Sequence, residues 1–149
     1  MKYSPIQNYI NGKFEAASST KTMEVISPLD GNLLSTVPLS SAKDLDAAVK
    51  AAKAAFTSWS KTPIKERVQV FFRYKTLLER DLKQLAELCS EENGKTYGES
   101  VAEIEKCIEL TEFACSLPQL VTGEILEVSK GVECRTEHVA LGVVASIVP

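Results

Sequence analysis

The stretch of sequence that most constrains the fold lies at the carboxyl-terminal end of the chain. Residues 142–148 read Gly-Val-Val-Ala-Ser-Ile-Val, which is almost wholly apolar and shows no alternation with polar residues. Such a run is typical of a strand that is buried on both faces, as in a parallel sheet. A parallel strand needs covering helices and neighbouring strands that are reached through crossover connections. Because domains rarely end within a core strand, we expect these 149 residues to be the front of a longer protein.

The first forty residues are predicted to form β-hairpins. Asn11-Gly12 stands between short runs of strand-forming residues, and this dipeptide is a strong signal for a tight hairpin turn. A second turn is predicted at residues 28–31, where Pro-Leu-Asp-Gly separates two further strand-like segments.

Three amphipathic helices are predicted between residues 41 and 118. Ser41 followed by Asp44 suits a helix start, with an acidic residue in the first turn. The second helix is expected to begin at Thr62-Pro63 and to end at Asn93-Gly94, where the glycine supplies the left-handed residue that follows many helices. The third is expected to run from about Gly98 to Cys115, before Pro118.

Composition excludes several classes of function. The chain has 17 Lys and Arg against 20 Asp and Glu, a net charge of −3, which disfavours a nucleic-acid binder. Its apolar runs are far shorter than a membrane span, and the amino terminus has no apolar signal core. We therefore expect a cytoplasmic protein without nucleic-acid or membrane partners.

The four cysteines do not indicate a metal site or a disulfide framework. They lie at positions 89, 107, 115 and 134, without the short paired spacings of a zinc site, so no metal is predicted. We interpret Cys107 and Cys115, eight residues apart, as small apolar residues on the inward face of the third helix. The single histidine, His138, falls in the alternating segment 132–139, which is typical of a half-exposed strand.

A combination of motifs is more specific than any single one. It comprises an Ile-Asn-Gly-Lys hairpin, Ser-Pro-Leu-Asp-Gly, a helix ending in Trp59, Glu-Asn-Gly-Lys-Thr at 92–96, Glu-Phe-Ala at 112–114, Gly123-Glu124 and the final Leu-Gly-Val-Val-Ala-Ser-Ile-Val-Pro. In this order, over essentially the whole chain, the sequence resembles the N-terminal third of the NAD(P)-dependent aldehyde dehydrogenase superfamily. Residues 112–132 are most similar to the CoA-acylating methylmalonate-semialdehyde dehydrogenases.

The resemblance implies an α/β fold that is truncated here. It implies N-terminal β-hairpins (1–40), a helical layer of the cofactor domain (41–118), a connection with an oligomerisation-type strand (119–139) and the first strand of a doubly wound Rossmann-like sheet (140–149). Family members form dimers or tetramers, so the resemblance also implies a homo-oligomer.

The same resemblance implies an oxidoreductase that oxidises an aldehyde, in particular a semialdehyde. In the family a cysteine thiolate forms a thiohemiacetal, hydride passes to NAD or NADP, and the thioester is released to water or CoA. No catalytic residue is assigned here, because the catalytic Cys, Glu and Asn would lie beyond residue 149. Ile147, Val148 and Pro149 are the expected cofactor-binding residues, since the end of this strand lines the dinucleotide in the family. Core and turn roles remain the alternative for these three.

Lys106 is the expected substrate residue. It matches the position at which several semialdehyde-oxidising relatives use an Arg to bind the substrate carboxylate, and Lys lacks the planar fork of Arg. The alternative is a surface lysine paired with Glu103 or Glu109. For the chain as a whole, the alternative function is a self-standing helical interaction module without catalysis.

Overall fold

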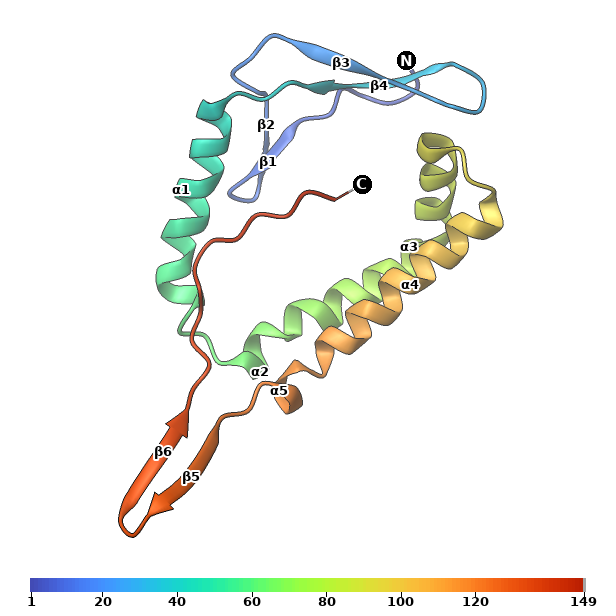
Figure 1. The fold of residues 1–149 in the computed structure, drawn as a ribbon. Coiled ribbons are helices and arrows are strands. Elements are labelled where there is room, and N and C mark those ends of the chain that lie inside the picture. Colours follow the sequence, from blue (N-terminus) through green and yellow to red (C-terminus); the bar gives the residue numbers. More distant parts are fainter. Residues whose placement is uncertain (149) are drawn as a thin grey trace.

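The chain folds into an open, ring-like arrangement of hairpins and helices rather than a closed globule (Figure 1). The structure is a computed structural model, and it describes residues 1–148. In chain order the elements are β1 (Asn8–Ile10), β2 (Lys13–Glu15), β3 (Thr22–Ile26), β4 (Leu33–Pro38), α1 (Ala42–Trp59), α2 (Ile64–Arg67), α3 (Gln69–Asn93), α4 (Tyr97–Cys115), α5 (Leu117–Leu120), β5 (Glu124–Ser129) and β6 (Val132–Thr136).

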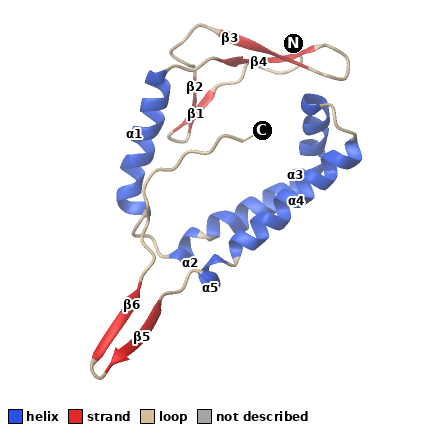
Figure 2. Ribbon diagram, viewed as in Figure 1, coloured by secondary structure: helices blue, strands red, loops and turns tan. Residues whose placement is uncertain are grey.

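The strands form three separate antiparallel hairpins, β1–β2, β3–β4 and β5–β6 (Figure 2). The predicted Asn-Gly turn is confirmed: Asn11 and Gly12 both have positive φ, 51° and 78°, as a tight hairpin turn requires. The second predicted turn is confirmed between β3 and β4. The third hairpin was only half predicted, because β6 was expected and its partner β5 was not.

The amino terminus connects the β3–β4 hairpin to the far end of α3. The backbone N–H of Tyr3 donates to the carbonyl of Leu34 at 2.8 Å. The Tyr3 hydroxyl donates to one carboxylate oxygen of Glu91 at 2.6 Å, and the Lys2 ammonium donates to the other. These contacts raise the pKa of Lys2 and lower that of Glu91. Residues far apart in sequence thus complete the ring seen in Figure 1.

The predicted start of α1 is confirmed in detail. The Ser41 hydroxyl accepts from the N–H of Lys43, and the Asp44 carboxylate accepts from the N–H of Ser41 at 2.7 Å, which forms a capping box. Asp44 also accepts from the backbone N–H of Ser18 at 2.9 Å and from its hydroxyl at 2.8 Å. The start of the helix is therefore tied to the loop between β2 and β3.

Helices α3 and α4 pack side by side, and their contact holds part of the small core (Figure 1). Ala86 of α3 and Ser100 of α4 are both fully buried, and Leu78 and Thr111 are nearly so. The turn between the helices has the predicted left-handed glycine, since Gly94 has φ +81°. A Cβ at this position would also lie 2.9 Å from Cγ of Pro28, so the turn abuts the β3–β4 loop.

Two helix boundaries differ from the sequence prediction. The helix expected to start at Thr62-Pro63 is divided into α2 and α3 at Val68, although Val68 keeps right-handed helical dihedrals and donates to the Ile64 carbonyl. Thr62 was expected as the N-cap, but Pro63 occupies that position. The Thr62 hydroxyl instead donates to the Ser58 carbonyl at 3.3 Å, after the end of α1.

The prediction of a strand at residues 140–149 is not realised in the described part of the chain. Residues 137–148 form an irregular segment, and Gly142 has φ +127°. A strand is defined by hydrogen bonds to a neighbour, and residues 1–148 supply no parallel strand beside this run. The segment crosses the interior of the ring in Figure 1 with its apolar side chains exposed: Leu141 is 96% and Ile147 101% accessible.

The accessible surface shows how open the arrangement is. A compact monomer of 16.3 kDa has about 7,500 Å² of accessible surface, whereas this chain has 11,695 Å², an excess of about 4,200 Å². In the described residues the buried apolar side chains are only those of Leu34, Val68, Leu78 and Ala86. The amphipathic faces predicted from the sequence are present, but much of their apolar surface lacks a partner.

Acid should weaken the start of α1 through Asp44. Hydrogen bonds from Ser41 and Ser18 hold the Asp44 pKa well below its ordinary value of 3.8. This group therefore contributes stability above about pH 4, and the contribution is lost as pH falls through the lowered pKa. The free energy of unfolding can be measured by chemical denaturation, followed by the helix signal, at pH 7, 4, 3 and 2. Between pH 4 and 2 this free energy should fall less in Asp44→Asn than in the parent.

Asp46→Asn is the matched control for that measurement. Asp46 lies on the same helix, and among residues 1–148 its carboxylate forms one ion pair, with the exposed Lys50 ammonium at 3.3 Å. Its substitution should leave the acid sensitivity unchanged, because surface ion pairs contribute little. Equal acid sensitivity in Asp44→Asn and the parent would contradict the role assigned to Asp44.

Candidate functional site

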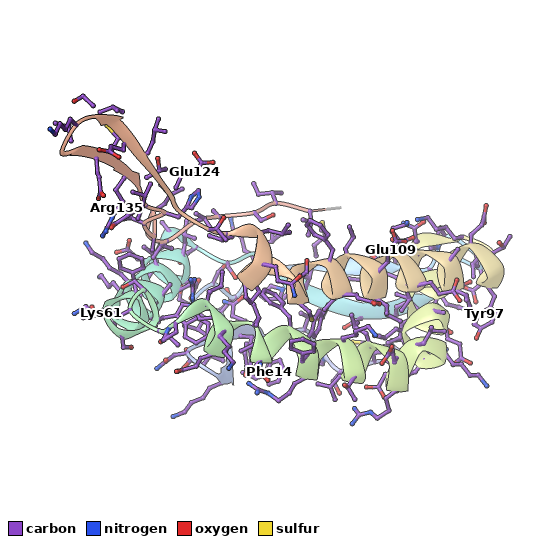
Figure 3. The ribbon with its side chains drawn as sticks, turned by 90° about the horizontal axis from the view of Figure 1, so that it is seen from below. Phe14, Lys61, Tyr97, Glu109, Glu124 and Arg135 are labelled. Atoms are coloured by element: carbon purple, nitrogen blue, oxygen red, sulfur yellow. The ribbon has the colours of Figure 1, made fainter. Side chains whose placement is uncertain are left out.

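The predicted substrate residue, Lys106, lies in the middle of α4. Its ammonium forms an ion pair with the carboxylate of Glu109, one helical turn along the same helix. Both side chains are well exposed, 60% for Lys106 and 67% for Glu109. Figure 3 shows Glu109 on α4, between Tyr97 at the start of the helix and the β5–β6 hairpin that carries Glu124 and Arg135. The surface pairing that the sequence left open for Lys106 is thus present, with Glu109 as the partner.

The predicted cofactor-binding residues lie in the carboxyl-terminal segment. Ile147 is fully accessible and Val148 is 76% accessible. Pro149, the third predicted residue, lies outside the described residues. Within residues 1–148, no hydrogen bond or ion pair joins this segment to Lys106. The structure therefore does not bring the two predicted parts of the site together.

The described residues do not by themselves form a dinucleotide site. Such a site in an α/β protein needs the carboxyl ends of adjacent parallel strands and a phosphate-binding turn at a helix start. The three sheets described are isolated antiparallel hairpins, and residues 142–148 are not paired. Ile147 and Val148 offer apolar surface of the kind that an adenine ring contacts, but no group here would hold the phosphates.

The cysteines occupy different environments. Cys107 and Cys134 are exposed, whereas Cys89 and Cys115 are half-buried. The interpretation of Cys107 as a buried small apolar residue is therefore wrong. In this open arrangement Ser100 and Thr111 of α4 are buried, whereas Cys107, which falls on the same helical stripe, has its side chain exposed. His138 follows β6 rather than lying within it, because that strand ends at Thr136.

Sequence reasoning missed one polar group, Arg67 at the end of α2. Its Nε is buried and has no hydrogen-bond partner among the described residues. Arg67 lines an open hollow of about 390 Å³ between α2 and the segments that flank the β5–β6 hairpin, together with Ile64, Val121, Gly123, Thr136, Glu137 and His138. The one sequence signal is that Arg67 stands between the apolar residues Ile64 and Val68.

The described part of the chain contains no helix with the length and apolar character needed to cross a membrane. Its residues also include no group of three or more His, Cys, Asp and Glu side chains arranged to hold a metal ion.

Comparison with known proteins gives one consistent result. Residues 14–149 match the family described as "Aldehyde dehydrogenase family". The chain is 41% identical over 145 residues to "Malonate-semialdehyde dehydrogenase 1" of Geobacillus kaustophilus, a match that covers 97% of this chain. The Geobacillus thermodenitrificans protein of that name is 42% identical over the same length. The chain spans about 30% of the length of these curated relatives.

Solved structures agree with the sequence comparison. A putative methylmalonate-semialdehyde dehydrogenase from Sinorhizobium meliloti, complexed with NAD, superposes with a TM-score of 0.84 at 34% identity. The methylmalonate-semialdehyde dehydrogenase from Oceanimonas doudoroffii gives 0.85 at 33% identity. Each match covers 91% of this chain and 28% of the solved one. The open arrangement is thus similar to one part of a larger fold.

Proposed function

Because the chain belongs to the aldehyde dehydrogenase family, we propose that it forms the N-terminal part of an oxidoreductase that oxidises a semialdehyde with NAD or NADP. The observation that carries this proposal is the 41% identity to a malonate-semialdehyde dehydrogenase across 97% of the chain. The acyl group formed in such a reaction passes to water or to CoA. The excess of about 4,200 Å² of accessible surface supports a role within a larger unit and disfavours a self-standing interaction module.

The 149-residue chain is expected to have no dehydrogenase activity by itself. Catalysis of this type needs a nucleophilic cysteine, a general base and an oxyanion-stabilising donor in one site. We assign none of these roles to the four cysteines here. Purified chain supplied with malonate semialdehyde and NAD or NADP should form no reduced nucleotide above the no-enzyme rate. Aldehyde-dependent formation of NADH or NADPH by the chain would overturn this assignment.

A chimera tests the proposed function directly. Residues 1–149 replace the matching part of the Geobacillus kaustophilus malonate-semialdehyde dehydrogenase, about 30% of that protein. We expect the chimera to fold and to oxidise malonate semialdehyde, because the exchanged segment has the same fold as that part of the related structures. A soluble, well-folded chimera without activity would count against the proposal, since the catalytic groups themselves come from the relative.

The chimera also tests Lys106, which we propose contacts the substrate carboxylate. Lys106→Met should raise the KM for malonate semialdehyde about tenfold, with little change in kcat, because a charge-assisted hydrogen bond is lost. Lys106→Arg should lower that KM below the parent value, since Arg binds carboxylates in a bidentate manner.

Two controls make the Lys106 result specific. An aldehyde without a carboxylate should show the same KM in all three proteins. Lys50→Met removes another helix-surface lysine that is paired with an acid, Asp46, and should leave both KM values unchanged. Equal KM values for malonate semialdehyde in the parent and Lys106→Met would leave Lys106 as a surface residue paired with Glu109.

The domain organisation and cofactor contacts are part of the same proposal. Residues 140–149 would become the first strand of the cofactor-domain sheet once parallel neighbours pair with them, which would bring Ile147, Val148 and Pro149 to the dinucleotide edge. Residues 41–118 would form the covering helical layer and 1–40 the hairpin region. The β5–β6 hairpin, in the segment 119–139, would take part in a homo-oligomer.

A further inference from the structure

A cluster of three reactive groups lies where α3 meets α4, apart from the proposed substrate and cofactor residues. The thiol of Cys89 on α3 donates to a carboxylate oxygen of Glu103 on α4 at 3.8 Å. The Lys95 ammonium, from the loop between the helices, donates to that same oxygen. Thiol, carboxylate and ammonium are therefore neighbours. We propose that this cluster makes Cys89 a peroxide-sensitive modification site, at which hydrogen peroxide converts the thiol to a sulfenic acid.

The loop that carries Lys95 is held from both sides. Gly94, with φ +81°, ends α3 and donates its N–H to the Ser90 carbonyl at 2.9 Å. The Ser90 hydroxyl donates to the Lys95 carbonyl at 2.7 Å. Thr96 then starts α4 with a capping box to Glu99. These contacts fix the backbone on each side of Lys95. The positions that its ammonium can reach are therefore restricted to a region next to Cys89.

The three groups have complementary roles in the oxidation. The Lys95 ammonium holds the pKa of Glu103 below its ordinary value, so this carboxylate stays ionised and accepts the S–H proton in a hydrogen bond that orients the thiol. The sulfur electron pair attacks one peroxide oxygen, the O–O bond breaks, and the departing hydroxide takes the proton to become water. Sulfur is oxidised by two electrons and peroxide is reduced. The ammonium stabilises the negative charge that develops on the departing hydroxide.

The other cysteines provide an internal comparison. Cys107 and Cys134 are more exposed than Cys89, and neither of their thiols makes a hydrogen bond to a described residue. If accessibility alone decided the rate, these two would react before Cys89. If the neighbouring ammonium and carboxylate decide it, Cys89 reacts first. The order of reaction therefore separates the two explanations.

The test is a time course of hydrogen peroxide treatment of the 149-residue chain, with dimedone present to trap sulfenic acids. Peptide mass spectrometry gives a labelling rate for each cysteine. We expect Cys89 to be labelled about tenfold faster than Cys107 or Cys134. Lys95→Met should reduce the Cys89 rate to that of Cys107, and Lys95→Arg, which keeps the charge, should retain most of it.

Lys50→Met is the matched control, because it removes a helix-surface lysine that is paired with an acid, Asp46, and is not part of the cluster. It should leave the Cys89 rate unchanged. Circular dichroism of each variant shows whether the helices persist, so that a slow variant is not simply unfolded. Labelling that follows exposure, with Cys89 slowest of the three, would overturn the proposal. An unchanged Cys89 rate in a folded Lys95→Met would do the same.

Discussion

The purified 149-residue chain is expected to form dimers or larger species in light-scattering measurements. Its accessible surface exceeds that of a compact monomer of the same mass by about 4,200 Å², more than the roughly 1,000–2,500 Å² that each partner buries in many obligate dimers. Much of the excess is apolar: Phe72 is 49% exposed, Phe113 63% and Leu126 64%. Apolar patches of this extent drive association in water.

The chimera described above is the control for that association. There the relative's own chain covers the faces that the isolated segment exposes, so assembly should stop at the relative's normal oligomeric state. A dye that fluoresces on apolar surfaces should bind strongly to the isolated chain and weakly to the chimera. A monodisperse monomer of the isolated chain at high protein concentration, with no dye binding, would contradict this expectation.

Enlarging Ala86 should strongly destabilise the α3–α4 pair. Ala86 is fully buried, and Ser100 on α4 is fully buried as well, so the helices approach closely where small residues line the contact. Ala86→Leu adds three carbon atoms to a site with no exposed surface and is expected to cost about 1–3 kcal/mol. Thermal unfolding followed by the helix signal at 222 nm measures the loss.

Two further variants serve as a control and as a comparison with the opposite expected effect. Ala54→Leu on the exposed part of α1 should change stability by less than about 0.5 kcal/mol, since leucine and alanine are both good helix formers. Ser100→Ala should increase stability, because the buried Ser100 hydroxyl has no hydrogen-bond partner among the described residues. An Ala86→Leu midpoint equal to that of the parent would show that the helices do not pack at this point.

The sequence predicted the local elements well, because their signals are local. Asn11-Gly12, Ser41 with Asp44, and Gly94 each act through the backbone of a few neighbouring residues, and all three adopt the expected conformations. Residues 124–129 were not recognised as a strand, although Glu-Ile-Leu-Glu-Val-Ser carries an incomplete alternation. That strand depends on pairing with β6, which the prediction considered without a partner.

The candidate site was less accessible to prediction because it depends on contacts that are distant in sequence. The apolar run at 142–148 predicts a segment suited to burial, but a strand also needs neighbours, and residues 1–148 do not provide them. For Lys106, the predicted role was substrate binding, and the alternative of a surface ion pair left Glu103 and Glu109 equally open as partners. In the structure Glu109 pairs with Lys106, whereas Glu103 is engaged by Lys95 from the loop between the helices.

The attachment of the amino terminus to Glu91 has a consequence for synthesis. Helices α3 and α4 are consecutive in the chain, so they can pack together as soon as both have left the ribosome. Lys2 and Tyr3 emerge first, yet they have no acidic partner until residue 91 follows, several seconds later at about 5–20 residues per second. The ring therefore closes only after α3 has been synthesised. A tag fused ahead of Met1 would emerge before that closure and would lie beside Glu91 when it occurs.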